Sequence, residues 1–247
     1  MGNYQLARVL NLQGKTDDAA DMYQRTLEAQ RLLYGDTSTK VGDTLTELAG
    51  VRLAQNRVSE AEKLMAESLE LSRKIRGASH HTSGYILSAL AQIHWRQNKL
   101  KLAEGELKSS LEIFATSLPP DHQYVASAEY IMGEVMLSMG RLPDAEAVLT
   151  ASMNRWKRTD APAWRAARSA SALGETLHRA GHTRDAEKYL LEGYRELTVG
   201  NGADAQTRTK ARERIAHFYV DTGQREKLNE LQLATSHDVT APAVRPN

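Results

Sequence analysis

The sequence predicts an all-α protein assembled from about six tandem helix–turn–helix units. Three markers recur in register along its 247 residues, and successive copies lie 42, 42, 42, 41 and 42 residues apart. The first marker is an early pair: Leu6-Ala7, Leu48-Ala49, Leu90-Ala91, Met132-Gly133, Leu173-Gly174 and Ile215-Ala216. The second follows seven residues later: Gly14, Asn56, Asn98, Gly140, Gly181 and Gly223. The third lies five residues beyond that: Ala19, Ala61, Ala103, Ala145, Ala186 and Leu228. Such a fixed period indicates a stacked array without a single central core.

Each unit is predicted to hold two antiparallel helices. In the second copy the apolar residues are spaced three and four apart, which is the helical period; they are Leu45, Leu48, Val51, Ala61, Leu64, Met65 and Leu69. Asn56 interrupts the pattern where a residue with positive φ would close the first helix. Ser59 and Glu62 then fit a capping box that starts the second helix. In the fourth copy, Pro143 fits the first turn instead.

Turn signals separate the units, and the small residues have a packing role. The signals are Gly35-Asp36, Gly77-Ala78-Ser79, Pro119-Pro120-Asp121, Asp160-Ala161-Pro162 and Gly200-Asn201-Gly202. The third marker is alanine in the first five copies because the second helix presses on the first there. Counted from the early pair, the repeats are predicted at residues 3–44, 45–86, 87–128, 129–169, 170–211 and 212–234. Residues 235–247 have no apolar period and are predicted to be a disordered tail.

Composition excludes several classes of protein. The formal net charge of +1 argues against a dedicated nucleic-acid binder, which carries a strong basic excess. The chain has no cysteine, so it has no disulfide framework and no thiolate metal site, which fits a reducing, cytoplasmic location. No stretch approaches the roughly 20 apolar residues of a membrane span, and "MGNYQLARVL" lacks the pattern of a signal peptide.

The motifs of common enzymes are missing, so we predict no enzyme, no cofactor and no metal. The sequence has no H-E-x-x-H, no G-x-S-x-G and no phosphate loop. His80-His81 falls in a loop between units without a nearby carboxylate, which favours a solvated loop over a metal site. The densest basic cluster is interleaved with Trp156 and Trp164, which we expect to pack against the adjacent unit; its members are Arg155, Lys157, Arg158, Arg165 and Arg168. Cations at a helix C-terminus are favourable in their own right, so nucleic-acid binding is the weaker interpretation.

The repeat resembles the tetratricopeptide repeat. That family has Leu-Gly early in its first helix, Gly at the turn and Ala-x3-aromatic in its second helix. The fifth copy matches with Leu173-Gly174, Gly181 and Ala186-x3-Leu190, and the first with Ala19-x3-Tyr23. The 42-residue period is the version seen in kinesin light chains and many bacterial proteins. The resemblance implies a right-handed α-solenoid over about residues 3–234 and a protein-interaction scaffold as its function.

The last three copies also resemble the repeats that follow a Ser/Thr kinase domain in some bacteria. The chain has no G-x-G-x-x-G loop, no H-R-D and no D-F-G, so this resemblance does not imply kinase activity. The resemblance leaves a second hypothesis open. The chain would be a structural or regulatory C-terminal segment of a larger bacterial signalling protein, with its groove packed on a neighbouring domain. Fusion to a membrane-anchored kinase would allow an extracytoplasmic location.

The resemblance also implies where a protein or peptide ligand would bind. In the family the first helix of each repeat lines the concave face, and three positions point into it: two before, two after and five after the early Leu. The predicted groove residues are Tyr4, Arg8, Asn11, Gln92, Trp95, Tyr130, Glu134, Glu175, His178 and His217. The same positions also hold Thr46, Gly50, Leu53, Ser88, Leu137, Ser171, Glu213 and Val220. Exposed aromatics among polar neighbours are typical of a binding surface. The alternative, that Trp95 only fills space beside a small neighbour, stays open.

The first copy starts abruptly after "MGN", without the residues that precede the later first helices. Solenoids shield their terminal units with polar-faced caps. We therefore expect either the C-terminal part of a longer polypeptide or a chain that self-associates through this end. The expected exposed edge consists of Leu6, Val9, Leu10, Tyr23 and Leu27.

Overall fold

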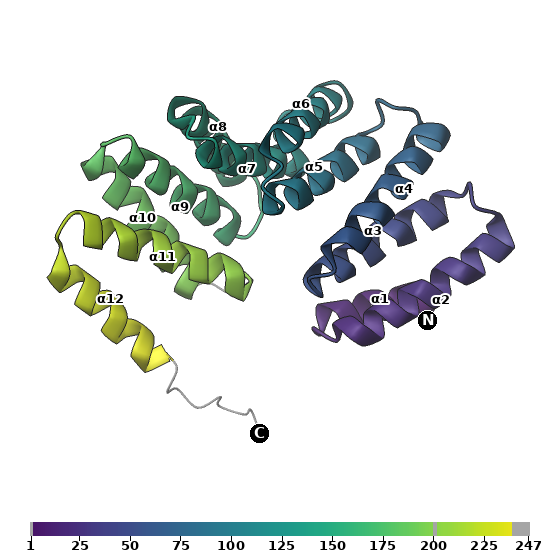
Figure 1. Ribbon diagram of the computed structural model, residues 1–247, viewed down its shortest axis with the longest axis horizontal. Coiled ribbons are helices and arrows are strands. Elements are labelled where there is room, and N and C mark those ends of the chain that lie inside the picture. The colour runs from purple at the N-terminus through teal and green to yellow at the C-terminus, as the bar shows by residue number, and fades with distance from the viewer. Residues whose placement is uncertain (1, 200–201, 239–247) are drawn as a thin grey trace. The chain divides into compact units, whose positions relative to one another are not determined.

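The computed structural model describes residues 2–199 and 202–238, and these residues form twelve α-helices without a strand (Figure 1). The all-α prediction is therefore confirmed. The helices are α1 (Asn3–Leu12), α2 (Thr16–Tyr34), α3 (Thr39–Ala54), α4 (Val58–Arg76), α5 (His81–Arg96), α6 (Leu100–Ser117), α7 (Gln123–Ser138), α8 (Leu142–Lys157), α9 (Trp164–Arg179), α10 (Thr183–Val199), α11 (Ala205–Asp221) and α12 (Arg225–Asp238).

The helices fall into two compact units. The first comprises residues 1–139 and contains α1 to α7, each of which packs against the next along the chain. The second comprises residues 140–247 and contains α8 to α12, where α9 packs against α8, α10 and α11. Within each unit the contacts run between neighbouring helices, as a stacked repeat requires.

The six predicted turns adopt the expected backbone conformation. Gly14, Asn56, Asn98, Gly140, Gly181 and Gly223 all have positive φ, between 59° and 84°. At Asn56 the helix is closed by two backbone bonds, from Asn56 N–H to Leu53 C=O (3.0 Å) and from Arg57 N–H to Arg52 C=O (2.8 Å). Asn tolerates this left-handed conformation better than other residues with a Cβ, which explains its place beside the glycines.

The capping box predicted at Ser59 and Glu62 is wrong. Helix α4 begins at Val58, one residue before Ser59, and its N-cap Arg57 makes no side-chain bond. The tight turn leaves no extended residue between the left-handed Asn56 and the helix that could place a capping hydroxyl. Glu62 instead accepts a 2.8 Å hydrogen bond from Gln97, at the turn of the next helix pair. The equivalent Gln55 donates to Asp17 of the preceding pair at 2.6 Å.

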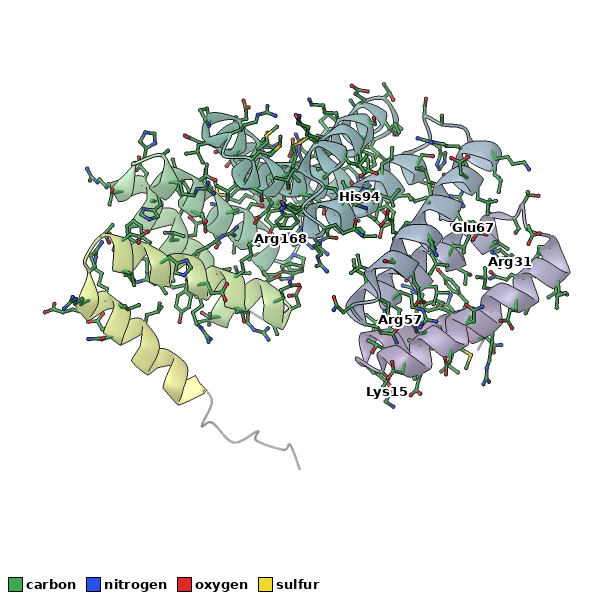
Figure 2. The ribbon with its side chains drawn as sticks, in the orientation of Figure 1. Lys15, Arg31, Arg57, Glu67, His94 and Arg168 are labelled. Atoms are coloured by element: carbon green, nitrogen blue, oxygen red, sulfur yellow. The ribbon has the colours of Figure 1, made fainter. Side chains whose placement is uncertain are left out.

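Further polar contacts join successive pairs of the first unit. Arg31 of α2 and Glu67 of α4 form an ion pair and point toward one another in Figure 2. His94, labelled in the same figure, is buried and lies between two carboxylates. Its Nδ1 lies 2.7 Å from Glu106 of α6, and its Nε2 lies 3.3 Å from Glu62 of α4. Both polar edges of this buried ring are therefore satisfied.

From α3 onward, each odd-numbered helix starts several residues before the predicted boundary of its repeat. Caps fix the starts: Ser38, His80 and His122 each accept a hydrogen bond from the backbone N–H two residues later. The boundaries drawn at residues 45, 87, 129, 170 and 212 therefore fall inside α3, α5, α7, α9 and α11. Helix α12 extends to Asp238, beyond the predicted start of the tail at 235, and the predicted disorder of residues 239–247 lies outside the described residues.

Small residues allow the two helices of a pair to approach closely. Ala19, Ala61, Ala103 and Ala186 are all fully buried, as the third marker predicts. Seven residues after Ala61, Ser68 of α4 donates to the carbonyl of Gly42 in α3 at 2.9 Å. The equivalent Ser110 of α6 donates to the carbonyl of Gly84 in α5 at 2.7 Å. A serine hydroxyl can reach the facing backbone only if no larger side chain intervenes.

The second unit uses glycines for the same purpose. A Cβ added to Gly193 of α10 would lie 2.8 Å from the backbone N of Ser171 in α9. A Cβ added to Gly174 of α9 would lie 2.8 Å from the backbone N of Leu190. Both distances are too short for any side chain, so the contact between α9 and α10 depends on these two glycines.

The apolar edge expected on the first pair is only partly correct. Tyr23 and Leu27 are buried, in a core cluster that also contains Ala7, Val41 and Leu48. They lie on the side of α2 that packs against α3, so helix α3 covers them. Leu6 is exposed, whereas Leu10 packs partly against the same cluster.

We predict that Ala103→Leu lowers the free energy of unfolding by about 1–3 kcal/mol, because the larger side chain overpacks the contact between α5 and α6. Gly105→Leu is the matched control, since a Cβ at Gly105 meets no atom within 4 Å. Replacing that helical glycine should leave stability unchanged or raise it by up to about 1 kcal/mol. Chemical denaturation measures both; equal stabilities would contradict the packing role of Ala103.

The histidine caps predict a pH dependence. Burial is the main cause that lowers the pKa of His80, and the nearby charges of His81 and Arg76 lower it further. Burial also lowers the pKa of His122, with a smaller contribution from His81. A histidine whose folded pKa is depressed stabilises the fold above its unfolded pKa of about 6.5 and loses that contribution as the pH falls. The neutral Nδ1 is also the capping acceptor, so protonation removes the bond.

We therefore expect the free energy of unfolding to fall between pH 7.5 and 5.5. The double variant His80→Asn/His122→Asn keeps a capping acceptor without a titrating group, so its loss over this range should be smaller. Denaturation series at several pH values provide the comparison. Identical pH profiles for the two proteins would rule out the caps as the cause.

Candidate peptide-binding groove on the first unit

A hollow of about 240 Å³ opens on the odd-numbered helices of the first unit. We call it the tyrosine hollow. Its lining comes from α1, α3, α5 and α7, with one residue from the end of α4: Tyr4, Asp43, Thr46, Glu47, Arg76, His81, Thr82, Tyr85 and Tyr124. Four successive first helices therefore contribute to one site.

The repeat period brings these residues together. Asp43 and Tyr85 occupy the same register position, five residues before the early Leu of their copies. Thr82 and Tyr124 likewise share a position, in the first turns of α5 and α7. Because stacked repeats are related by a small rotation, equivalent positions lie on one face. The hollow therefore lies along the N-terminal halves of α3, α5 and α7.

Aromatic rings form much of the wall. The rings of Tyr85 and Tyr124 have centroids 5.1 Å apart, and Tyr124 also lies against the buried Phe114 of α6 at 5.9 Å. The ring of Tyr4 meets the buried Tyr23 edge to face at 5.7 Å. Tyr85 is 41% exposed, so a large aromatic surface remains open to a ligand.

The charged groups of the hollow differ in how they are satisfied. Arg76 holds Asp43 at 3.2 Å and donates to the hydroxyl of Thr82 at 3.0 Å. Glu47 accepts a hydrogen bond from Tyr23 at 3.4 Å, near the upper limit for such a bond. Burial, followed by Glu47, raises the pKa of both Tyr4 and Tyr85. Both phenols therefore stay protonated at neutral pH and can donate hydrogen bonds.

Tyr4 is the one member of the ten predicted groove residues that lines this hollow. Arg8 is exposed on α1, while Asn11 and Gln92 are half-buried. Trp95 donates its indole N–H to Ser138 of α7 at 2.9 Å, so it joins α5 to α7. The expectation of an exposed aromatic at Tyr130 is wrong: it is buried and donates to Glu134, also buried, at 2.9 Å.

The other three predicted residues lie in the second unit. Glu175 of α9 accepts a hydrogen bond at 3.1 Å from Arg214 of α11, which is buried. His178 Nε2 lies 2.9 Å from Asp221, again between α9 and α11. Both side chains hold neighbouring helices together, whereas His217 is exposed.

Position two before the early Leu faces the second helix more than the groove. Thr46 shares a 2.8 Å hydrogen bond with Ser68, although it also lines the hollow. Ser88 is buried and lies 3.1 Å from Ser110 of α6. The groove face is therefore better described by the position five before the early Leu. The sequence held a signal for this. Three residues that can cap a helix recur 42 residues apart, at Ser38, His80 and His122, and they show that two further helical turns precede the early Leu.

A second hollow, of about 460 Å³, lies between α8, α9 and α10, and Lys157 is the one member of the predicted basic cluster that lines it, together with Trp156. Trp156 is buried, as expected, and Trp164 packs against a buried cluster that includes Ala167 and Leu197. The guanidinium of Arg165 lies 5.0 Å from the Trp156 ring and 4.9 Å from the Trp164 ring. Cation–π contacts therefore explain part of the cluster without a ligand.

Among the described residues, no helix combines the length and apolar character that a membrane crossing needs. His80 and His81, whose rings lie 4.2 Å apart, do not sit in a merely solvated loop. His80 caps α5, and His81 lines the tyrosine hollow.

Solved structures of known proteins share this fold. A protein called BtubC, from P. vanneervenii, is 17% identical with a TM-score of 0.71 over 94% of this chain and 96% of that chain. Repeats of a putative kinesin light chain from Podosopora anserina are 16% identical with a TM-score of 0.64, over 81% and 96%. A signal transduction ATPase with a tetratricopeptide repeat sensor, from Pyrococcus horikoshii, is 16% identical with a TM-score of 0.71, over 96% of this chain but 36% of that one. No curated protein matches the sequence.

At these identities the structural likeness shows the fold alone, and the family follows from the sequence. The model of the tetratricopeptide repeat family matches residues 2–64, 40–116 and 124–195, which together make up most of the chain. Repeats of a putative kinesin light chain share this fold, which is the one that the 42-residue period predicts. The chain belongs to the tetratricopeptide repeat family.

Proposed function

We propose that the chain is a non-catalytic scaffold that binds a segment of a partner protein in the tyrosine hollow. The observation that carries this proposal is the convergence of α1, α3, α5 and α7 on one hollow with three tyrosines in its lining. Tyrosine is enriched at interfaces because it combines a large apolar ring with a hydrogen-bonding tip. Repeats of this family generally mediate contacts between proteins.

Pre-organisation would supply the affinity. The side chains of the hollow are already held by the fold: Arg76 is fixed by Asp43 and Thr82, and the rings of Tyr85 and Tyr124 support each other. A receptor whose groups are in place before binding does not lose their rotamer entropy when the ligand arrives. A partner segment would be ordered against a rigid wall.

The bacterial signalling context stays part of the proposal. In the alternative hypothesis, the groove packs on a neighbouring domain of a larger protein, such as a Ser/Thr kinase. The two hypotheses differ in whether the isolated chain binds a free peptide, because a groove built for its own neighbouring domain gains affinity from the covalent link. A cytoplasmic location is proposed on the cysteine-free composition.

Selection of random 12-residue peptides displayed on phage tests the proposal. Selected peptides should bind the chain, and Tyr85→Ala should weaken them at least tenfold, since interface tyrosines often contribute more than 1 kcal/mol. Tyr34→Ala is the matched control, because Tyr34 is also half-exposed but lies at the end of α2, outside the hollow. Fluorescence anisotropy measures the affinities. Peptides that bind both variants equally would place binding elsewhere, and a selection without binders would contradict the proposal.

Self-association is a second candidate function. Among the described residues, four of the five exposed leucines lie on the first helix pair: Leu6, Leu12, Leu32 and Leu33. Exposed apolar side chains that gather on one helix pair make that pair a candidate interaction surface. A second copy of this chain could cover it.

We expect reversible association in light scattering over a concentration series. The double variant Leu6→Glu/Leu32→Glu should abolish it, because burying the new charges would be unfavourable. Leu102→Glu, on α6 and also exposed, is the control and should associate like the unchanged chain. A strictly monomeric chain at every concentration would exclude this function.

A further inference from the structure

Glu47 is the one acidic residue of the tyrosine hollow whose carboxylate has no cationic partner among the described residues. The hydrogen bond that it accepts from the hydroxyl of Tyr23 is long, at 3.4 Å. Asp43, the other carboxylate of the lining, is paired with Arg76 at 3.2 Å. We propose that Glu47 and the tyrosines around it bind the side chain of a lysine or arginine of the partner segment. This inference rests on the proposed function, since it names the residue that the hollow selects.

The position of Glu47 among aromatic residues supports the assignment. It accepts from Tyr23, and after burial it is the largest cause that raises the pKa of Tyr4 and of Tyr85, so its charge lies close to both hydroxyls. Its three tyrosine neighbours come from α1, α2 and α5. A carboxylate beside aromatic rings attracts a cation in two ways, by charge and by the negative faces of the rings.

The cations already present do not neutralise this carboxylate. Arg76, in the lining, is engaged by Asp43 and Thr82. Arg8 is exposed on α1 and forms no ion pair within the described residues, although it is near enough to lower the pKa of Tyr4. With His81 counted as neutral, the lining carries Asp43 and Glu47 against Arg76 alone, so the hollow has one net negative charge.

The size of the hollow fits a side chain better than a larger ligand. Its volume of about 240 Å³ is below the usual 300–1,000 Å³ of sites for drug-sized molecules. A long, flexible aliphatic stem with a cationic head can lie along the rings of Tyr85 and Tyr124 and reach Glu47. An acidic side chain would instead meet two carboxylates, which repel it.

The selected peptides described above provide the test. We expect a lysine or arginine at a fixed position in them, and replacing it by norleucine or citrulline should weaken binding at least tenfold. Glu47→Gln should weaken the parent peptide by a similar factor, because the amide keeps an acceptor for Tyr23 but loses the charge. Glu70→Gln, an exposed carboxylate on α4 outside the hollow, is the matched control and should bind like the unchanged chain. Fluorescence anisotropy at two salt concentrations measures each pair.

Charge reversal keeps the test decisive if Glu47→Gln is less stable than the parent chain. Glu47→Lys should reject the parent peptide and bind a version with glutamate in place of its basic residue. Two results would overturn this inference and leave the proposed function standing. The first is a peptide whose binding depends on Tyr85 but that carries no basic residue. The second is a peptide whose affinity does not change when the charge at position 47 is removed or reversed. A selection that yields no binder at all would remove the proposed function and this inference with it.

Discussion

The close approach of the two helices in each pair is the constraint on which the rest of the structure depends. The axes can come together only where a small residue faces the partner backbone, and the chain supplies one at every contact described. In the first unit, Ser68 and Ser110 reach the carbonyls of Gly42 and Gly84 directly. In the second, Gly174 and Gly193 leave no room for a Cβ. Within each unit, this close approach lets one helix pair pack on the next.

This regular stacking creates the tyrosine hollow. Equivalent positions on α3 and α5 carry Asp43 and Tyr85, and the turns that join the helices are fixed in length by the left-handed residues. The repeat therefore converts a spacing of 42 residues in sequence into neighbouring side chains in space. Histidine caps start α5 and α7 beside the hollow: His81 directly follows the cap His80, and Tyr124 lies two residues after the cap His122. The residues that start these helices are therefore immediate sequence neighbours of residues that line the hollow.

Polar residues in this array have two distinct roles that the sequence pattern does not separate. Trp95, Glu175 and His178 lie on the helices predicted to line a groove, yet each bonds to the equivalent helix of the next repeat. Glu47 lies on the same kind of helix, but within the part of the chain that the structure describes its carboxylate forms no ion pair and accepts only a long hydrogen bond from Tyr23. A polar group that joins repeats contributes to stacking, whereas a polar group left with a weak partner is available to a ligand. Only the positions of the neighbouring helices distinguish the two roles.

The sequence by itself determined the architecture. The period, the left-handed turn positions and the buried alanine in the second helix of the first five copies were all readable, because backbone conformation and close packing restrict residue type strongly. The tertiary structure alone decided which side chains meet. Ser88 faces α6 and Tyr130 is buried, whereas Tyr85 and Tyr124 form the wall of the hollow. The same repeat position can face a partner helix, a neighbouring repeat or the open groove, because packing between helices that are distant in sequence sets how each helix is turned about its axis.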